Sequence, residues 1–166
     1  ILALLGENGS GKTTLMKTIL GFDIKHTGTV NFNGFKRQEI GFLPQKTQHQ
    51  KDFPASVGEV IMSGFAGNGF FGLRYAKCHK KQAENNIKLL GLESITEKSF
   101  SELSGGQQQK VLLCRALCAA KKVLLLDEPV TSLDEAAAEE MYAIIKKLNK
   151  KFFFIRMYNC RPIHHR

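Results

Sequence analysis

The feature of the chain that points most directly to a chemistry is a glycine-rich stretch that ends in lysine and threonine. It lies between an apolar run at residues 1–5 and a helically spaced apolar pattern that ends at Gly21. Glycines let successive backbone N–H groups turn toward phosphate oxygens, and the N-terminus of the following helix adds positive potential. We therefore predict a phosphate-binding loop in which Lys12 contacts the β- and γ-phosphates and the Thr13 hydroxyl binds Mg²⁺. The predicted loop consists of Gly6, Glu7, Asn8, Gly9, Ser10, Gly11, Lys12, Thr13 and Thr14.

A second candidate group is a pair of carboxylates at the end of another apolar run. Residues 123–126 are Val-Leu-Leu-Leu, and Asp127, Glu128 and Pro129 follow them. The carboxyl ends of strands in α/β sheets are where such sheets bind ligands. We predict that Asp127 holds Mg²⁺ through water and that Glu128 polarises the water that attacks the γ-phosphate.

The elements that must position these groups alternate between strands and helices. Apolar runs predict strands at residues 1–5, 28–34, 40–43 and 123–126. The spacing of Leu15, Ile19 and Leu20 predicts a helix that ends at Gly21. Helical spacing also predicts helices at residues 56–63, 79–90, 107–119 and 135–148. Alternation of this kind predicts an α/β fold with a mostly parallel sheet flanked by helices. The helical stretch at residues 51–102 interrupts the alternation and is interpreted as an inserted subdomain.

Composition narrows the class of protein. The 166 residues, 43% hydrophobic and 23% charged, are typical of one soluble globular domain. No apolar run approaches the ~20 residues of a membrane span, and no secretion signal is expected. The net charge of +9 is spread thinly along the chain, so we expect a solvated basic surface and no nucleic-acid partner. The four cysteines form no Cys-x-x-Cys pair, which favours free thiols in a reducing cytosol.

A third motif makes the pattern specific. It is Leu103-Ser104-Gly105-Gly106-Gln107, just before a predicted helix. With the phosphate loop and the acidic strand end, in that order, it makes residues 1 to about 151 resemble the nucleotide-binding domain of ATP-binding cassette (ABC) transporters. That domain is a P-loop NTPase with an inserted helical subdomain. The resemblance implies ATP and Mg²⁺ as ligands and Lys12, Gln45 and Glu128 as catalytic residues, and it makes Thr13, Gln45 and Asp127 the Mg²⁺ ligands.

The resemblance also implies a second copy of the chain. The signature residues, Ser104 to Gln107, would contact ATP held by the other copy, because Ser104 and the backbone after it form an anion cradle at a helix N-terminus. Two copies would then dimerise head to tail with two-fold symmetry. The loop expected to cross the dimer interface is Ser132-Leu133-Asp134.

The family pattern divides the chain into four segments. Residues 1–50 and 107–151 are expected to form the nucleotide-binding core, without its leading strands, and residues 51–106 the helical subdomain that ends in the signature. Residues 152–166 show no family pattern and are interpreted as an aberrant basic tail. In the family a strand here ends in a histidine that contacts the γ-phosphate, expected near position 159, where this chain has Asn159. We hypothesise a reading-frame change after Lys151; the alternative is a divergent strand with an ordinary tail.

Other departures from the family pattern affect the expected nucleotide affinity and rate of ATP hydrolysis. The family's adenine-stacking aromatic precedes the phosphate loop, and this chain starts five residues before Gly6. Lys110 replaces a usual arginine and Ser132 a common glycine. We therefore expect weak nucleotide binding and slow or absent hydrolysis, and a non-catalytic fragment remains the alternative.

Finer resemblance points to one branch of the family. Residues 52–57, 112–118 and 139–142 are similar to bacterial zinc- and manganese-type uptake importers. This implies a membrane permease, an extracytoplasmic solute-binding protein, and a cytoplasmic location on the inner face of the cell membrane. Importers of other substrates, such as iron chelates, remain an alternative. ABC-type ATPases that act on DNA carry long coiled-coil insertions, for which the separation of 92 residues from Lys12 to Ser104 leaves no room.

Several residues are of types that could bind a metal ion or contact a partner protein. Cys114 and Cys118 share a helix face, and we expect them to pack in the core. Aromatic residues of the loop at 64–72 either contact the permease or pack over their own subdomain; they are Phe65, Phe70 and Phe71. The histidines are expected to be isolated surface residues or, at the end of the chain, a poor chelate: His26, His49, His79, His164 and His165.

Overall fold

The computed structural model describes residues 2–7, 9–22, 25–34, 36–45, 54–66, 75–131, 133–149 and 153–159. For Ala3 and for residues 153–159 the description covers the backbone. Asn8, His49, Phe70, Phe71, Ser132, Cys160, His164 and His165 lie outside the described residues, and so do the expectations placed on them.

In the part of the chain that the structure describes, four parallel strands form one central sheet. They are β1 (Leu2–Gly6), β2 (Ile40–Leu43), β3 (Val123–Asp127) and β4 (Phe153–Asn159), in the spatial order β1-β4-β3-β2. The register pairs Gly6 with Asn159 and Asp127 with Met157. Because all strands run in the same direction, the carboxyl ends of β1, β2 and β3 meet at one edge of the sheet. The expected α/β fold with a parallel sheet is confirmed.

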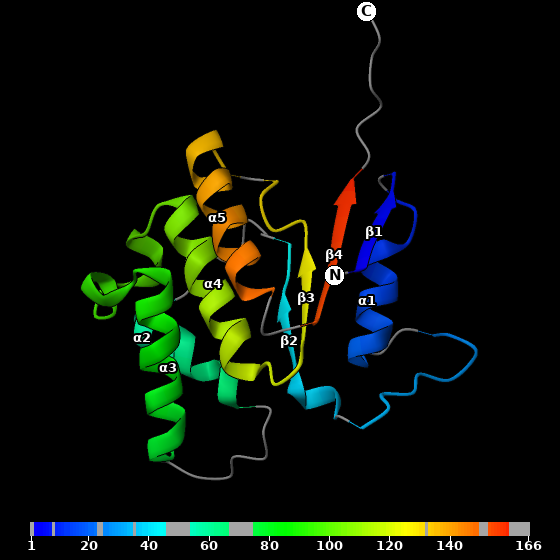
Figure 1. The fold of residues 1–166 in the computed structure, drawn as a ribbon, viewed down its shortest axis with the longest axis horizontal. Coiled ribbons are helices and arrows are strands. Elements are labelled where there is room, and N and C mark those ends of the chain that lie inside the picture. The colour runs from blue at the N-terminus through cyan, green and yellow to red at the C-terminus, as the bar shows by residue number, and fades with distance from the viewer. Residues whose placement is uncertain are drawn as a thin grey trace, which may run out of the picture.

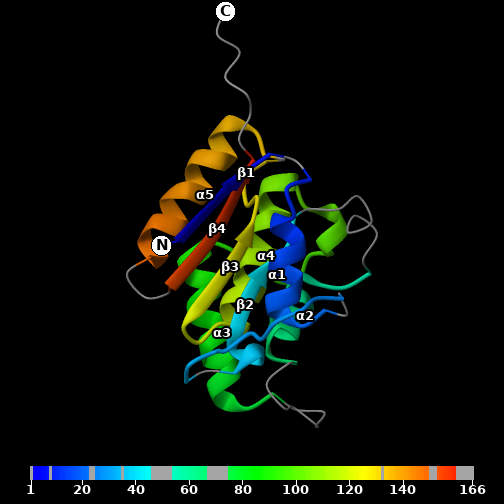
Figure 2. The ribbon, with the colours of Figure 1, turned by 90° about the vertical axis from the view of Figure 1, so that its right-hand side faces the viewer.

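Helices cover both faces of this sheet. They are α1 (Lys12–Leu20), α2 (Val57–Met62), α3 (Lys77–Leu90), α4 (Gly105–Ala119) and α5 (Glu135–Leu148). Short 3₁₀ turns occupy Arg37–Glu39, Ser63–Phe65, Glu93–Ile95 and Phe100–Glu102. Helix α1 lies on one face of the sheet, and α4 and α5 lie on the other, with α2 and α3 packed outside α4 (Figures 1 and 2). None of the described helices is both long and apolar enough to cross a membrane.

Strand β3 joins the two apolar layers. Its side chains alternate, so Leu124 and Leu126 belong to the large core on the α4 and α5 side. Leu125 packs with Met16 and Ile40 in a smaller core under α1. All five residues of β3 are buried, as expected of a central parallel strand. Because β3 is buried along its whole length, its last residue, Asp127, is held at the carboxyl edge of the sheet.

Part of the segment interpreted as an aberrant tail forms a strand, which agrees with the alternative of a divergent strand. This strand, β4, pairs with β1 on one side and β3 on the other. A continuous apolar run such as Phe153-Phe154-Ile155 is typical of a strand with a parallel neighbour on each side, but the basic composition of the segment favoured a tail. Asn159, the last residue of β4, lies beside Gly6 in the register.

The strand expected at residues 28–34 does not form in the described part of that segment. Gly28, Asn33 and Gly34 all adopt positive φ angles, of 106°, 30° and 92°. A backbone that turns at three positions cannot hold the extended conformation of a strand. The segment is therefore a loop that leads to the 3₁₀ turn before β2.

Two cysteines of α4 and one phenylalanine of the helical subdomain are core residues. Cys114 and Cys118 are buried, as predicted, and a hydrogen bond between the two thiols together with burial raises the pKa of Cys114. Among the described residues, no cluster of three or more histidine, cysteine or acidic side chains could hold a metal. Phe65 is 1% exposed and stacks on His79 with ring centroids 4.6 Å apart. Phe65 therefore follows the second of the two alternatives, packing within its own subdomain, and His79, expected at the surface, is partly buried against it.

Candidate functional site

The glycine-rich loop connects β1 to α1 and wraps around the side chain of Lys12. Gly11 is the N-cap of α1 and has a φ of 86°, a left-handed conformation that glycine adopts without strain. The ammonium of Lys12 donates hydrogen bonds to the carbonyl oxygens of Gly6 and Glu7, at 2.9 and 2.7 Å, and to Ser10 Oγ at 3.3 Å. The lysine charge is thus held within the loop, next to the N-terminus of a helix, where an anion is stabilised.

A hydrogen bond joins this loop to the acidic end of β3. Thr13 Oγ1 donates to Asp127 Oδ2 over 3.0 Å. Asp127 is 2% exposed, and burial raises the pKa of its carboxyl while the Thr13 hydroxyl opposes that rise. A hydroxyl and a carboxylate are the hard oxygen ligands that Mg²⁺ prefers. The pair therefore fits a magnesium ion, whose charge would favour the ionised carboxylate.

The second carboxylate, Glu128, sits in a turn with unusual backbone geometry. Its φ of 47° is left-handed, which a residue with a side chain adopts only when its surroundings hold it there. Gln45, which follows β2, donates from Nε2 to Glu128 Oε2 over 3.2 Å. Glu128 is 9% exposed, so this carboxylate is largely shielded from bulk water. The arrangement orients one carboxylate oxygen through the glutamine amide.

These groups surround one open pocket of about 450 Å³. The side chains that could bind phosphate, hold a cation and orient water therefore share one solvent-accessible space. The residues that line the pocket are Gly9, Gly11, Lys12, Thr13, Thr14, Gln45, Glu128 and Thr131. Thr131 was not predicted, although a hydroxyl residue four positions after a strand-end aspartate is a signal that could have found it.

The signature residues lie apart from this pocket, at the start of α4. Ser104 caps the helix by accepting from the Gln107 N–H at 3.3 Å, and Gln107 Oε1 accepts from the Ser104 N–H at 3.1 Å. This reciprocal pair satisfies two of the free N–H groups at the helix N-terminus. Gly105 and Gly106 form the first turn of the helix. None of the four lines the pocket described above.

The loop expected at a dimer interface is described in part. Asp134 caps α5 by accepting from the Ala137 N–H at 2.9 Å, and the Leu133 N–H donates to the Val130 carbonyl at 3.1 Å. Leu133 therefore closes a turn from Val130, and Asp134 marks the start of α5.

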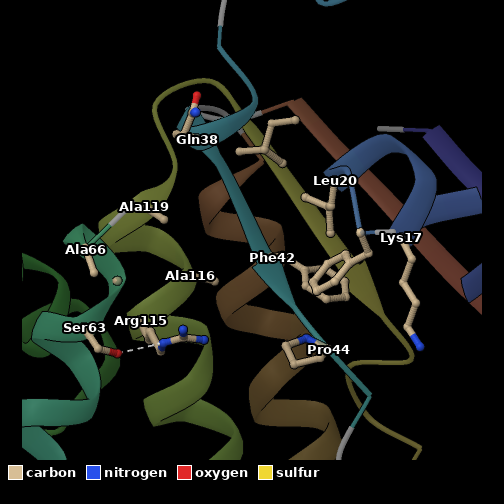
Figure 3. Close-up of a pocket in the computed structure, with 13 residues that line it drawn as sticks. Lys17, Leu20, Gln38, Phe42, Pro44, Ser63, Ala66, Arg115, Ala116 and Ala119 are labelled. Carbon is tan, nitrogen blue, oxygen red and sulfur yellow. Dashed lines mark hydrogen bonds between the residues drawn. The ribbon is translucent and has the colours of Figure 1, made fainter. Parts of the chain in front are cut away.

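A second hollow, an apolar groove of about 550 Å³, lies between α1, β2 and α4. Figure 3 shows Leu20 and Phe42 on one side and Arg115 reaching from α4 on the other. Arg115 Nε donates to Ser63 Oγ over 2.9 Å, and among the described residues no carboxylate lies within ion-pair distance of its guanidinium. The groove thus combines apolar walls with two cationic side chains, Lys17 and Arg115, and Phe22 at its rim is 53% exposed.

Comparison with known proteins gives one consistent result. Residues 1–131 match the family described as "ABC transporter". The manganese transport system ATP-binding protein MntB of Halalkalibacterium halodurans is 36% identical over 156 residues, which cover 91% of this chain and 62% of that protein. The zinc transport system ATP-binding protein TroB of Treponema pallidum is 35% identical over 152 residues, 89% of this chain and 57% of that protein. This chain therefore spans about three fifths of the length of these relatives.

Solved structures give the same match. An inward-facing metal-chelate type ABC transporter is 30% identical and superposes with a TM-score of 0.80, covering 95% of this chain and 62% of that chain. A nucleotide-free ATP-binding cassette from an ABC transporter, 24% identical, superposes with a TM-score of 0.78 over 97% of this chain and 70% of that chain, and it supports the fold alone.

Proposed function

Because the chain belongs to the ABC transporter family, we propose that it is an ATP-binding subunit that hydrolyses ATP to power a membrane transport system. The observation that supports this most is the convergence of Lys12, Thr13, Gln45 and Glu128 on one pocket. These four residues come from three separate segments of the chain. Their side-chain types match the four tasks of phosphoryl transfer to water: binding phosphate, holding Mg²⁺, orienting water and accepting a proton.

In this proposal each residue has a defined task. The loop N–H groups and the Lys12 ammonium bind the phosphates, and Thr13 and Asp127 hold Mg²⁺, assisted by Gln45. Bound Mg²⁺ would neutralise charge on the phosphates. Glu128 accepts the proton of the attacking water, and the amide of Gln45 fixes the orientation of that carboxylate. Thr14 lines the same pocket and bounds the phosphate site.

Loss of the loop lysine is expected to remove most nucleotide affinity. Lys12→Ala deletes a charged donor to phosphate worth about 1.5–3 kcal/mol, so ATP affinity should fall about 10- to 100-fold. Lys17→Ala, which removes an exposed lysine from the same helix, is the matched control and should bind as the unmodified chain does. Binding is measured by titration with a fluorescent ATP analogue and Mg²⁺. Equal affinity of both variants would remove the proposed phosphate site.

We propose the head-to-tail dimer on the same basis. The signature residues cap α4 outside the chain's own pocket, so a second copy is needed to bring them to ATP. Residues 1–50 and 107–151 form the proposed core and residues 51–106 the proposed helical subdomain. Asn159 stands at the end of β4 beside Gly6, near where the family resemblance places a histidine. This supports the expectation of slow hydrolysis, and the non-catalytic fragment remains the second candidate.

The proposed cargo is a divalent metal ion, manganese or zinc. Support comes from the relatives, which include manganese and zinc transport ATP-binding proteins. The proposal includes an integral membrane permease, a solute-binding protein and a cytoplasmic location on the inner face of the membrane. Uptake of radioactive Mn²⁺ and Zn²⁺ by cells that carry the complete system should require this subunit. Uptake of an iron chelate in place of both ions would support the alternative importer.

The apolar groove beside β2 is the surface we propose for the permease. A helix end with apolar side chains and one carboxylate would complement its walls and Arg115. Phe22→Asp places a charge at the rim and should reduce co-purification with the co-expressed permease about 10-fold. Leu89→Asp changes an apolar residue of similar exposure on α3, 47% exposed and away from the groove, and should have no effect. Both variants should keep ATP binding. Equal retention of the permease by both would exclude the groove as its contact surface.

A further inference from the structure

A buried glutamine ties α4 to the turn that carries Glu128. Gln109 is 1% exposed, and its Nε2 donates to the carbonyl oxygen of Pro129 over 3.1 Å. Its other amide atom, Oε1, is buried without a hydrogen-bond partner among the described residues. An unpaired buried acceptor costs stability, which an apolar side chain at this position would avoid. Gln109 is therefore poorly explained by packing alone.

The turn that receives this hydrogen bond is the strained one. Glu128 combines a φ of 47° with a proline as the next residue, and both features restrict its backbone. The Thr131 N–H reaches the Glu128 carbonyl only at 3.4 Å, so the turn's own hydrogen bond is weak. Pro129 is itself buried. Gln109 thus supplies a buried donor from another element to the residue directly after the strained glutamate.

We propose that Gln109 is a positioning residue for Glu128: its carboxamide holds the Pro129 carbonyl and thereby keeps the carboxylate of Glu128 aimed into the pocket. The role rests on the proposed hydrolysis of ATP at Glu128. Without this donor, the turn relaxes from its left-handed conformation, and the contact of Glu128 with Gln45 is lost. A misplacement of about 1 Å at a reacting group lowers a rate on the order of 100-fold.

The hydrogen bond from Gln109 to Pro129 also connects the Glu128 turn to the signature residues at the start of α4. Helix α4 begins at Gly105, capped by Ser104, and Gln109 lies on its second turn. A rigid helix passes a displacement of its N-terminus on to the side chains of its next turn. A ligand that contacts Ser104 from a second copy would in this way act on Glu128 of the chain that contributes the signature.

The neighbouring residue provides a matched control. Gln108 is 3% exposed, and its Nε2 donates to the Phe100 carbonyl over 3.1 Å, inside the helical subdomain. Gln108→Met and Gln109→Met therefore each remove one buried amide donor to a carbonyl from the same helix. Only Gln109→Met removes a hydrogen bond to the Glu128 turn.

Steady-state ATP hydrolysis by the full chain is the first measurement. We expect Gln109→Met to lower kcat about 10- to 100-fold with KM for ATP within about twofold, and Gln108→Met to leave both constants within about twofold. Thermal unfolding of both variants reports the structural cost separately. Similar kcat values for the two variants would overturn the proposal, whatever their stabilities.

Amide hydrogen exchange tests the positioning role of Gln109 without relying on ATP hydrolysis. In a peptide that spans residues 127–133, we expect exchange about 10-fold faster in Gln109→Met than in the unmodified chain and unchanged exchange in Gln108→Met. Unchanged exchange in both would overturn the positioning role. Absence of hydrolysis by the unmodified chain, with the exchange difference present, would instead remove the proposed function and leave the tie between α4 and the turn in place.

Discussion

Replacement of Glu128 by glutamine should slow ATP hydrolysis at least 100-fold and leave ATP binding intact. The amide keeps the size of the side chain but cannot accept a proton from water, and positioned general bases contribute about 10²–10⁴ to a rate. Affinity should be retained because Lys12, Thr13 and the loop N–H groups are unchanged. Release of inorganic phosphate and binding of an ATP analogue are measured on the same preparation.

The variant also tests the dimer, because ATP that is bound but not hydrolysed should hold two copies together. Size-exclusion chromatography with ATP and Mg²⁺ should therefore show a dimer for Glu128→Gln. Glu139→Gln, which changes an exposed carboxylate on α5, is the control and should hydrolyse ATP at the unmodified rate. Hydrolysis by Glu128→Gln at that same rate would show that the carboxylate is not the base. Phosphate release by neither the control nor the unmodified chain would favour the non-catalytic fragment.

Local patterns were sufficient to predict the phosphate loop and the acidic strand end. The loop depends on glycines whose conformations are set by neighbours within a few residues, as Gly11 shows at the start of α1. The position of Asp127 depends on a continuous apolar run that leads to the sheet edge. Gln45 was predicted near the pocket only by the family resemblance, and it lies two residues after the end of β2. For the loop and the acidic strand end, the determinant lies in a short segment of chain.

Features that depend on distant contacts were missed. Gln109 looks like any polar residue of a helix until the fold places Pro129 against it. The left-handed backbone of Glu128 follows from packing around the turn, and no residue type in this segment predicts it. Strand β4 was missed for a different reason. Its apolar run was visible, but the basic residues around it and the absence of a family pattern directed the interpretation to a tail.

Helix α4 can approach the sheet closely only because β2 contains a glycine, so Gly41→Ala should destabilise the fold strongly. A Cβ on Gly41 would lie 2.2 Å from the Ala116 carbonyl oxygen and 2.8 Å from Ala120 Cβ. Backbone atoms of a packed helix cannot move aside as a flexible side chain does, so we expect a loss of about 3 kcal/mol in the free energy of unfolding. Urea unfolding followed by circular dichroism measures this free energy.

The control is Gly58→Ala in α2, which has space for its methyl group. It should cost nothing or stabilise the fold by up to about 1 kcal/mol through helix propensity. Comparable midpoints for the two variants would mean that α4 is not seated against β2 at this distance. Because Gln109 extends from the same helix, a shift of α4 away from the sheet would also carry that side chain away from the Glu128 turn.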